Sequence, residues 1–183
     1  MKPVLLENVI SEKELFFIYS ELINTPSWSI TGKPSDTGYQ SNKNFLGAPQ
    51  LIVKGSNQVI HNYALYMLGR TFIYRIENML KDKNIGIHTN MIRMWFNITY
   101  FGKETQHWLH TDHHETDKQS IVIFMTPFWK NDWNGSFYVD GEKFPFKPGS
   151  AVIFDSKEYH TGESPTSETF NWQRLTCNIV MEE

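Results

Sequence analysis

The chain has 183 residues, of which 40% are hydrophobic and 15% aromatic, a globular composition that excludes a disordered chain. A formal net charge of -3 and a pI near 6.2 argue against nucleic acid as a partner, because such binding usually needs a basic surface. The length suits one domain over residues 1–183 that can bury a core without disulfides.

The single cysteine, Cys177, cannot form an internal disulfide, which is typical of a reducing compartment. The sequence contains no apolar run of about 18 residues and no signal-peptide pattern at its start. We therefore expect a soluble, cytoplasmic protein without a membrane partner. The oligomeric state has no readable signal.

The N-terminal part, residues 1–86, is expected to contain helices and loops. Ser11 is a plausible N-cap, and Glu14 occupies the capping-box position behind it. Apolar residues recur at helical spacing after this point until Pro26, so the first helix is predicted over about residues 11–24.

The following segment, residues 27–54, is rich in Pro, Gly, Ser and Asn and predicts a long loop with short extended pieces. A broad apolar face then predicts a second helix from about Asn57 to Lys81, which would support a sheet.

Residues 87–183 are expected to form a β core that carries the functional site. The period of apolar residues changes to two between Ile92 and Tyr100, where polar or aromatic residues occupy the odd positions. Further strands are predicted between Asn-Gly, Asp-Gly and Pro-Gly turns, and short strands of this kind favour a barrel or sandwich. The predicted strands are Ser120 to Thr126, Gly135 to Val139, Lys143 to Phe146, Ala151 to Phe154 and Trp172 to Met181.

Three residues of this part form a candidate metal site. His110 and Asp112 lie two apart, so on extended backbone both side chains leave the same face. His160 follows the apolar run that ends at Phe154, where a strand is expected to end and turn. Two imidazoles and one carboxylate, with further positions left open, suit a non-haem Fe(II).

Arg174 begins the last alternating run, in which Arg174, Thr176 and Asn178 share one face. An arginine that faces inward needs an anion, because its guanidinium is always charged. Either a bound carboxylate or an ordinary ion pair could supply the anion. The candidates for such a pair are Glu168, Glu182 and Glu183.

Together these residues resemble the Fe(II)- and 2-oxoglutarate-dependent dioxygenases, and within them the prolyl 4-hydroxylase-like branch. The resemblance spans about residues 93–180. Tyr100 precedes His110 by ten residues, like the family's tyrosine that hydrogen-bonds 2-oxoglutarate. Two further segments resemble the glycine-led strand and the turn and strand before the distal histidine. They are Asn134 to Tyr138 and Lys147 to Phe154.

The resemblance implies an α+β, mainly β fold, a double-stranded β-helix (a jelly-roll, cupin-like barrel) supported by the N-terminal helices. It implies that His110, Asp112 and His160 bind Fe(II) and form the catalytic centre. It also implies a 2-oxoglutarate site formed by Arg174, Thr176 and Tyr100. Where some relatives carry a second tyrosine, on the strand from Ser120 to Thr126, this sequence offers only Phe124, Met125 and Thr126.

The activity implied by the resemblance is hydroxylation of an unactivated C–H bond, with O2 consumed and 2-oxoglutarate decarboxylated to succinate and CO2. Ascorbate would be an additional cofactor. The expected substrate is a prolyl residue in a peptide or protein, with a free amino acid or another small molecule as the alternative. Asp112 disfavours a halogenase, in which that carboxylate is replaced to make room for halide.

Other interpretations stay open from the residues alone. His107 with His110 or His113 could bind Zn(II), or this histidine-rich segment could be a pH-sensitive loop. A cupin-like metal protein that does not use 2-oxoglutarate, or a binding barrel without catalysis, would share the predicted fold. Tyr100 falls on the apolar face of its strand and could be an ordinary core residue. Among the tryptophans, Trp129 and Trp133 are the first candidates for the substrate entrance, because they fall in a predicted loop.

Overall fold

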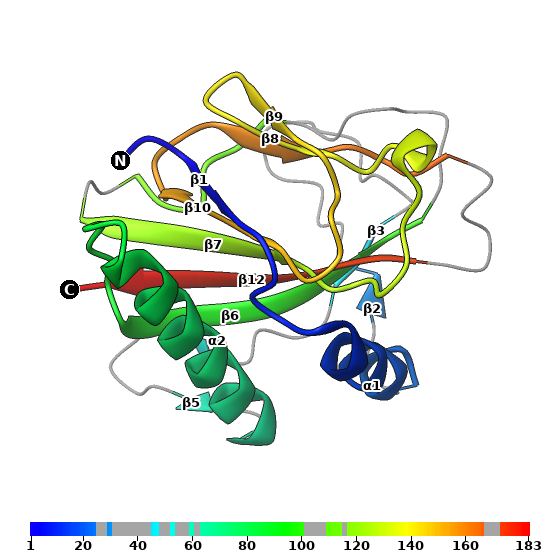
Figure 1. Ribbon diagram of the computed structural model, residues 1–183, viewed down its shortest axis with the longest axis horizontal. Helices are drawn as coiled ribbons and strands as arrows, with labels where there is room; N and C mark the ends of the chain where they lie inside the picture. The colour runs from blue at the N-terminus through cyan, green and yellow to red at the C-terminus, as the bar shows by residue number, and fades with distance from the viewer. Residues whose placement is uncertain are drawn as a thin grey trace.

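The computed structural model describes residues 1–24, 29–30, 45–47, 52–53, 59–60, 63–100, 109–114, 117–166 and 173–183 (Figure 1). Within these residues the chain is mainly β, with two α-helices. The helices are α1 (Glu12–Ile23) and α2 (Tyr63–Lys81), and η1 (Asn131–Trp133) is a short 3-10 turn. The strands are β1 (Val4–Leu6), β2 (Ser29–Ile30), β3 (Phe45–Gly47), β4 (Ile52–Val53), β5 (Val59–Ile60), β6 (Asn90–Thr99), β7 (Lys118–Phe124), β8 (Phe137–Val139), β9 (Glu142–Phe144), β10 (Ala151–Asp155), β11 (His160–Gly162) and β12 (Arg174–Glu182).

The strands form two sheets, and all of their pairs are antiparallel. The larger sheet has the order β1-β10-β7-β12-β6-β3-β2, with β4 and β5 attached beside β6. The smaller sheet has the order β11-β8-β9. Figure 1 shows α1 and α2 on one side of the larger sheet and β8 and β9 on the other. The larger sheet is therefore the middle layer of the described part.

The two faces of the larger sheet pack against different cores. On β7 and β10, Ile121, Ile123, Ala151 and Ile153 join the core beneath the helices. Their neighbours in sequence join a second core with residues of the smaller sheet, because side chains of a strand point alternately to opposite faces. The second core contains Val122, Phe124, Phe137, Val139, Phe144, Phe146, Val152 and Phe154.

The start of α1 agrees with its prediction. Ser11 is the N-cap, its side chain accepts a hydrogen bond from the Glu14 backbone N–H, and the Glu14 carboxylate accepts one from the Ser11 backbone. The Glu14 carboxylate also pairs with Arg75 of α2 at 2.6 Å. This ion pair joins the two helices.

The second helix begins later than predicted. It runs from Tyr63 instead of Asn57, because Val59 and Ile60 form β5, paired with Val53 and Ile52 of β4. Both residues are β-branched and fit a strand as well as an apolar helix face. The apolar pattern that predicted one helix therefore includes residues of both β5 and α2. The remainder of the predicted loop over residues 27–54 lies outside the described residues, apart from β2, β3 and β4.

The β core agrees with its predicted alternation, with strand ends that differ by a few residues. β8 begins at Phe137 instead of Gly135, because Gly135 has a φ of +82° that extended backbone does not adopt. β1 and β11 were not predicted as strands, since a run of three residues is too short to show a period. Cys177 is fully buried, as predicted, and burial raises the pKa of its thiol.

Neither described helix combines the length and the apolar character that crossing a bilayer would require.

Candidate metal centre

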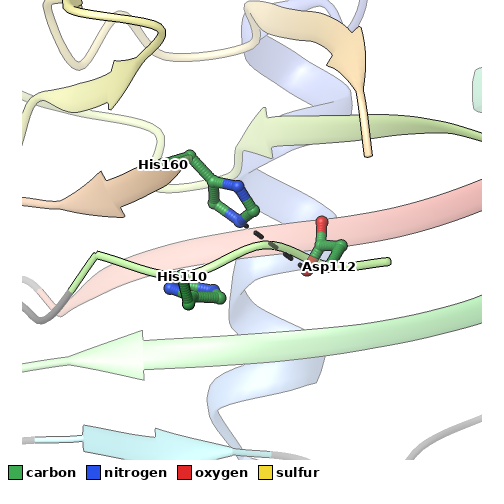
Figure 2. A group of neighbouring side chains, drawn as sticks. All are labelled: His110, Asp112 and His160. Carbon is green, nitrogen blue, oxygen red and sulfur yellow. Dashed lines mark ion pairs between the residues drawn. The ribbon is translucent and has the colours of Figure 1, made fainter. Parts of the chain in front are cut away.

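The backbone brings the three predicted ligands together from two distant parts of the chain. His110 and His160 form an antiparallel bridge, in which each backbone N–H donates to the carbonyl of the other at 3.1 and 2.9 Å. The Asp112 N–H donates to the Ser156 carbonyl at 3.1 Å, which ties the same segment to the end of β10. In Figure 2 the His160 ring points toward Asp112, and His110 lies on the same segment as Asp112.

The ring of His160 has one nitrogen engaged by the backbone and the other directed to the site. Its Nδ1 lies 3.0 Å from the Glu158 carbonyl oxygen, and its Nε2 lies 3.6 Å from Asp112 Oδ1. An N–H at Nδ1 would donate to this carbonyl and leave the lone pair on Nε2, which is how proteins commonly orient a metal-binding histidine. The His110 ring lies beside it, with 4.3 Å between ring centroids.

Asp112 is fixed by a hydroxyl and has a shifted pKa. The Ser120 hydroxyl donates to Asp112 Oδ2 at 2.7 Å and also contacts the Ser156 hydroxyl at 2.9 Å. Burial of Asp112 raises the pKa of its carboxyl, but the hydrogen bonds and charges of His160, Ser120 and His110 outweigh burial and lower it. Asp112 is therefore an anion at neutral pH, as a metal ligand must be.

The donor set fits a divalent metal ion. One ligand atom from each of His110, Asp112 and His160 can be chosen such that all three lie within 4.8 Å of one another. Among the described residues this cluster does not include His113, and His107 lies outside them. Three ligands on two short segments leave other coordination positions to smaller molecules, as an Fe(II) oxygenase or a catalytic zinc site requires.

Arg174 is buried near the same site, on the face of β12 opposite the helices. Its Nε–H donates to the Gly135 carbonyl at 2.6 Å, and its side chain lies so close to Gly162 that a Cβ there would be 3.4 Å from Nη2. Burial lowers the pKa of Arg174 to about 10, while the negative charge of Glu163 opposes this change. The guanidinium therefore stays charged at neutral pH.

No described carboxylate forms an ion pair with Arg174. Of the three partners considered from the sequence, Glu182 pairs with Lys118 at 4.0 Å, and Glu168 lies outside the described residues. Glu163 influences Arg174 only through its charge, because its Oε2 accepts a hydrogen bond from the Ser136 N–H at 3.1 Å. Among the described residues the Arg174 guanidinium therefore has no carboxylate partner.

The two other residues assigned to 2-oxoglutarate lie in different surroundings. Thr176 is buried on the same face of β12 as Arg174. Tyr100 follows the end of β6 and is 37% exposed. Burial raises the pKa of Tyr19 of α1 to about 12, and the charge of the nearby Tyr100 adds a smaller contribution in the same direction. The residue directly opposite Arg174 is Thr99, which is buried and whose hydroxyl has no hydrogen-bond partner among the described residues.

Several site residues were not predicted from the sequence. Ser120 and Ser156 hold Asp112, and Glu163 supports the charge of Arg174. Serine and glutamate are common in any sequence, so the only available signal was that Ser120 faces the same side of its strand as Val122 and Phe124.

The two tryptophans proposed for the substrate entrance lie in the segment between β7 and β8. Trp133 is buried, whereas Trp129 is partly exposed and packs on Phe146 with 4.5 Å between ring centroids. The Trp129 indole N–H donates to the Asn134 carbonyl at 2.8 Å, and its ring lies so close to Gly135 that a Cβ there would be 2.8 Å away. Trp129 thus packs around the glycine whose carbonyl holds Arg174.

Comparisons with known proteins give matches in structure only. No protein-family model and no curated protein matches the sequence. An oxidoreductase of the 2OG-Fe(II) oxygenase family from Burkholderia pseudomallei is similar over 99% of this chain and 85% of its own, with a TM-score of 0.68 and 13% identity.

Two further solved structures carry other activities on the same fold. A prolyl hydroxylase from Trichoplax adhaerens, solved with a hypoxia inducible factor peptide, matches over 98% of this chain and 83% of its own, with a TM-score of 0.61 and 13% identity. The alpha-ketoglutarate-dependent carbocyclase SnoK of nogalamycin biosynthesis matches over 99% and 79%, with a TM-score of 0.65 and 12% identity. The chain therefore has the fold of the 2-oxoglutarate–Fe(II) oxygenases, as the sequence resemblance predicts.

Proposed function

We propose that the protein is an Fe(II)- and 2-oxoglutarate-dependent dioxygenase. The observation that carries this proposal is the convergence of His110, Asp112 and His160. The buried Arg174 lies close by and forms no ion pair with the described residues. A cupin-like metal protein would need the three ligands but would have no use for a buried guanidinium. An arginine without a counter-ion is costly to bury, so its retention favours a bound dicarboxylate.

The spacing between the ligands and Arg174 suits 2-oxoglutarate. Gly162, which contacts the guanidinium, lies two residues beyond His160 on β11, which corresponds to about 7 Å along a strand. A five-carbon dicarboxylate can span such a distance, with one end at the metal and the other at Arg174. The Thr99 hydroxyl, opposite Arg174, has no hydrogen-bond partner in the part of the chain that the structure describes and would supply a further donor for the distal carboxylate.

The residues present would have distinct parts in the reaction. Fe(II) held by His110, Asp112 and His160 would supply O2 activation, coupled to conversion of 2-oxoglutarate to succinate and CO2 while one oxygen atom enters the substrate C–H bond. Asp112 would offset the charge of the metal, and the Glu158 carbonyl holds His160 in the orientation that metal binding would require. Arg174 would fix the co-substrate by a bidentate contact.

The proposed oxygenase function also implies a particular arrangement of the two sheets. We expect the two sheets to form a double-stranded β-helix, with residues 87–183 as the core that carries the site and residues 1–86 as its support. The division into two sheets with a shared core is consistent with that architecture.

Two substrate classes are proposed as alternatives. A prolyl residue in a peptide or protein is supported by the similarity to the Trichoplax adhaerens prolyl hydroxylase. A free amino acid or other small molecule is supported by the similarity to SnoK, which belongs to nogalamycin biosynthesis.

The test is succinate formation from 2-oxoglutarate by protein loaded with Fe(II) under anaerobic conditions and then exposed to O2. Wild-type protein should form succinate, and Asp112→Ala should form none, because it removes one of three ligands. Asp82→Ala, an exposed aspartate after α2, is the matched control and should keep wild-type turnover. Fe(II) binding by calorimetry reports on the site independently of turnover.

The outcomes separate the alternatives. Metal binding that depends on Asp112, without 2-oxoglutarate consumption under any condition, would favour the cupin-like protein. Unchanged metal binding in Asp112→Ala would overturn the assigned ligand set.

A further inference from the structure

A second arginine lies on the site face of the larger sheet. On β6, the residues Arg93, Trp95, Asn97 and Thr99 point to the face opposite the helices, since Met94, Phe96 and Ile98 join the core beneath the helices. The first three are partly exposed, whereas Thr99 is buried. This strand therefore offers a polar, accessible row beside the candidate metal centre.

Arg93 is held in place by its neighbours on that row. Its guanidinium carbon lies 4.1 Å from the centroid of the Trp95 ring. When the Asn97 amide is oriented to satisfy its surroundings, its oxygen accepts from Trp95 Nε1 at 3.2 Å and from Asn178 Nδ2 at 3.0 Å. The indole that supports Arg93 is thus fixed in turn by two side chains of the central strands. Such support limits the entropy lost when the guanidinium binds a ligand.

The charge of Arg93 is not balanced by an ion pair with the described residues. Its Nε is buried without a hydrogen-bond partner among them. Burial lowers the pKa of Arg93, and the negative charge of Asp112 opposes this effect. Asp112 already accepts a hydrogen bond from the Ser120 hydroxyl and is one of the three candidate metal ligands. A partly desolvated guanidinium in this position gains free energy from an external anion.

The sheet register places Arg93 beside the metal centre and apart from Arg174. Arg93 is opposite Val180 of β12, which is opposite Ser120 of β7, whose hydroxyl holds Asp112. Two strand spacings, roughly 10 Å, separate the Arg93 and Ser120 backbones, and the long arginine side chain covers much of this distance. Arg174 pairs with Thr99, about 20 Å from Arg93 along β6. Two different carboxylates can therefore be bound.

We propose that Arg93, supported by Trp95, binds a carboxylate of the primary substrate, so that the substrate is a carboxylic acid such as a free amino acid. This inference rests on the proposed oxygenase function. A prolyl residue inside a peptide has no charge and would leave Arg93 without a partner. A free amino acid presents its α-carboxylate a few bonds from its own C–H groups. An acidic side chain of a peptide offers the same carboxylate, and the test separates these two sources.

The test compares acids with their neutral amides. Succinate formation is measured with the proteinogenic L-amino acids, their α-amides, and peptides capped at both ends that carry an internal Pro, Asp or Glu. Acids should stimulate turnover and amides should not. Arg93→Met should raise the KM for the stimulating acid about 10- to 100-fold, the loss of a charge-assisted hydrogen bond, and leave the KM for 2-oxoglutarate at its wild-type value.

Two further variants serve as controls. Arg93→Lys keeps the charge without the planar fork and should give an intermediate KM. Arg70→Met removes an arginine of α2 that donates to the Thr89 carbonyl, and it should leave the KM for acid and for 2-oxoglutarate unchanged. Calorimetry with Zn(II) in place of iron and 2-oxoglutarate present measures binding of the acid without turnover, and the Arg93→Met variant should lose this binding.

Each result decides the proposal. Equal stimulation by acids and amides, a higher KM for 2-oxoglutarate in Arg93→Met, or no binding of any carboxylate would overturn it. Stimulation only by capped peptides with Asp or Glu would keep the carboxylate and assign it to a peptide. Acid binding that depends on Arg93, without succinate formation by the wild type, would support the carboxylate site and overturn the oxygenase function.

Discussion

The two faces of the larger sheet come from the same strands but carry opposite chemistry. Beneath the helices, β12 contributes Leu175, Cys177, Ile179 and Met181, all fully buried and apolar. On the other face the same strand contributes Arg174, Thr176 and Asn178, and β6 adds a second arginine. The alternation of a single strand thus separates the residues that stabilise the fold from those that serve the site.

The polar face also contains groups that the fold does not satisfy. Thr99 Oγ1 and Arg93 Nε are buried without hydrogen-bond partners among the described residues, and both lie on the face opposite the helices. Unsatisfied buried groups reduce stability, so their concentration on one face is typical of a place prepared for a ligand.

The largest effect on stability is expected on the apolar face. Ile179→Ala should lower the free energy of unfolding by about 2–5 kcal/mol, because Ile179 is fully buried and the truncation leaves a cavity. Asn178→Ala, the adjacent residue on the polar face, should cost only about 1 kcal/mol. Urea unfolding measures both, and equal losses would contradict the division between the faces.

On the polar face, substitution of Arg174 should affect binding of 2-oxoglutarate. Arg174→Met should raise the KM for 2-oxoglutarate about 10- to 100-fold, since it removes a charge-assisted contact, and metal binding should persist. Arg174→Lys should recover part of the loss. The KM follows from succinate formation at varied 2-oxoglutarate, and Fe(II) calorimetry gives metal binding. Wild-type KM in Arg174→Met would remove this arginine from the site.

Ser120 tests the support of the metal ligands. Ser120→Ala should weaken metal binding about 10- to 100-fold, because its hydroxyl orients Asp112. Ser150→Ala is the matched control, since this buried hydroxyl makes no hydrogen bond within the described residues. Co(II) titration followed by visible absorption gives the affinities. A similar loss in both variants would point to general packing and not to Asp112.

The smallest effect is expected in the helical layer. The hydrogen bond from Arg75, followed by those from Ser11, lowers the pKa of Glu14 from 4.5 to about 2. Its charge therefore stabilises the fold above pH 4.5, and this contribution is lost as the pH falls toward 2. Because the pair is largely exposed, Glu14→Gln should cost less than about 1 kcal/mol at pH 6. Urea unfolding at pH 6 and pH 3 should show the difference shrinking.

The sequence predicted those features that a short segment encodes by itself. Ser11 and Glu14 define the start of α1, and the alternation from Arg174 defines both faces of β12. Features that depend on pairing between distant segments could not be predicted from the sequence. The Asp112–Ser120 hydrogen bond, the stacking of Arg93 on Trp95 and the start of α2 all depend on how neighbouring elements meet.

The same limit applies to the co-substrate residues. Spacing before His110 indicated Tyr100, but strand register makes Thr99 the neighbour of Arg174. A difference of one residue along a strand changes the face, and spacing counted along the chain does not determine register. The part of Tyr100 in the site remains a prediction.

The central position of β12 has a consequence for biosynthesis. β12 pairs with β6 on one side and β7 on the other, yet it follows every other described strand in the chain. Until residues 174–182 have left the ribosome, β6 and β7 both present unpaired edges. We therefore expect the larger sheet to form only after these residues are synthesised, through contacts of long sequence separation that form slowly and expose nascent chains to aggregation.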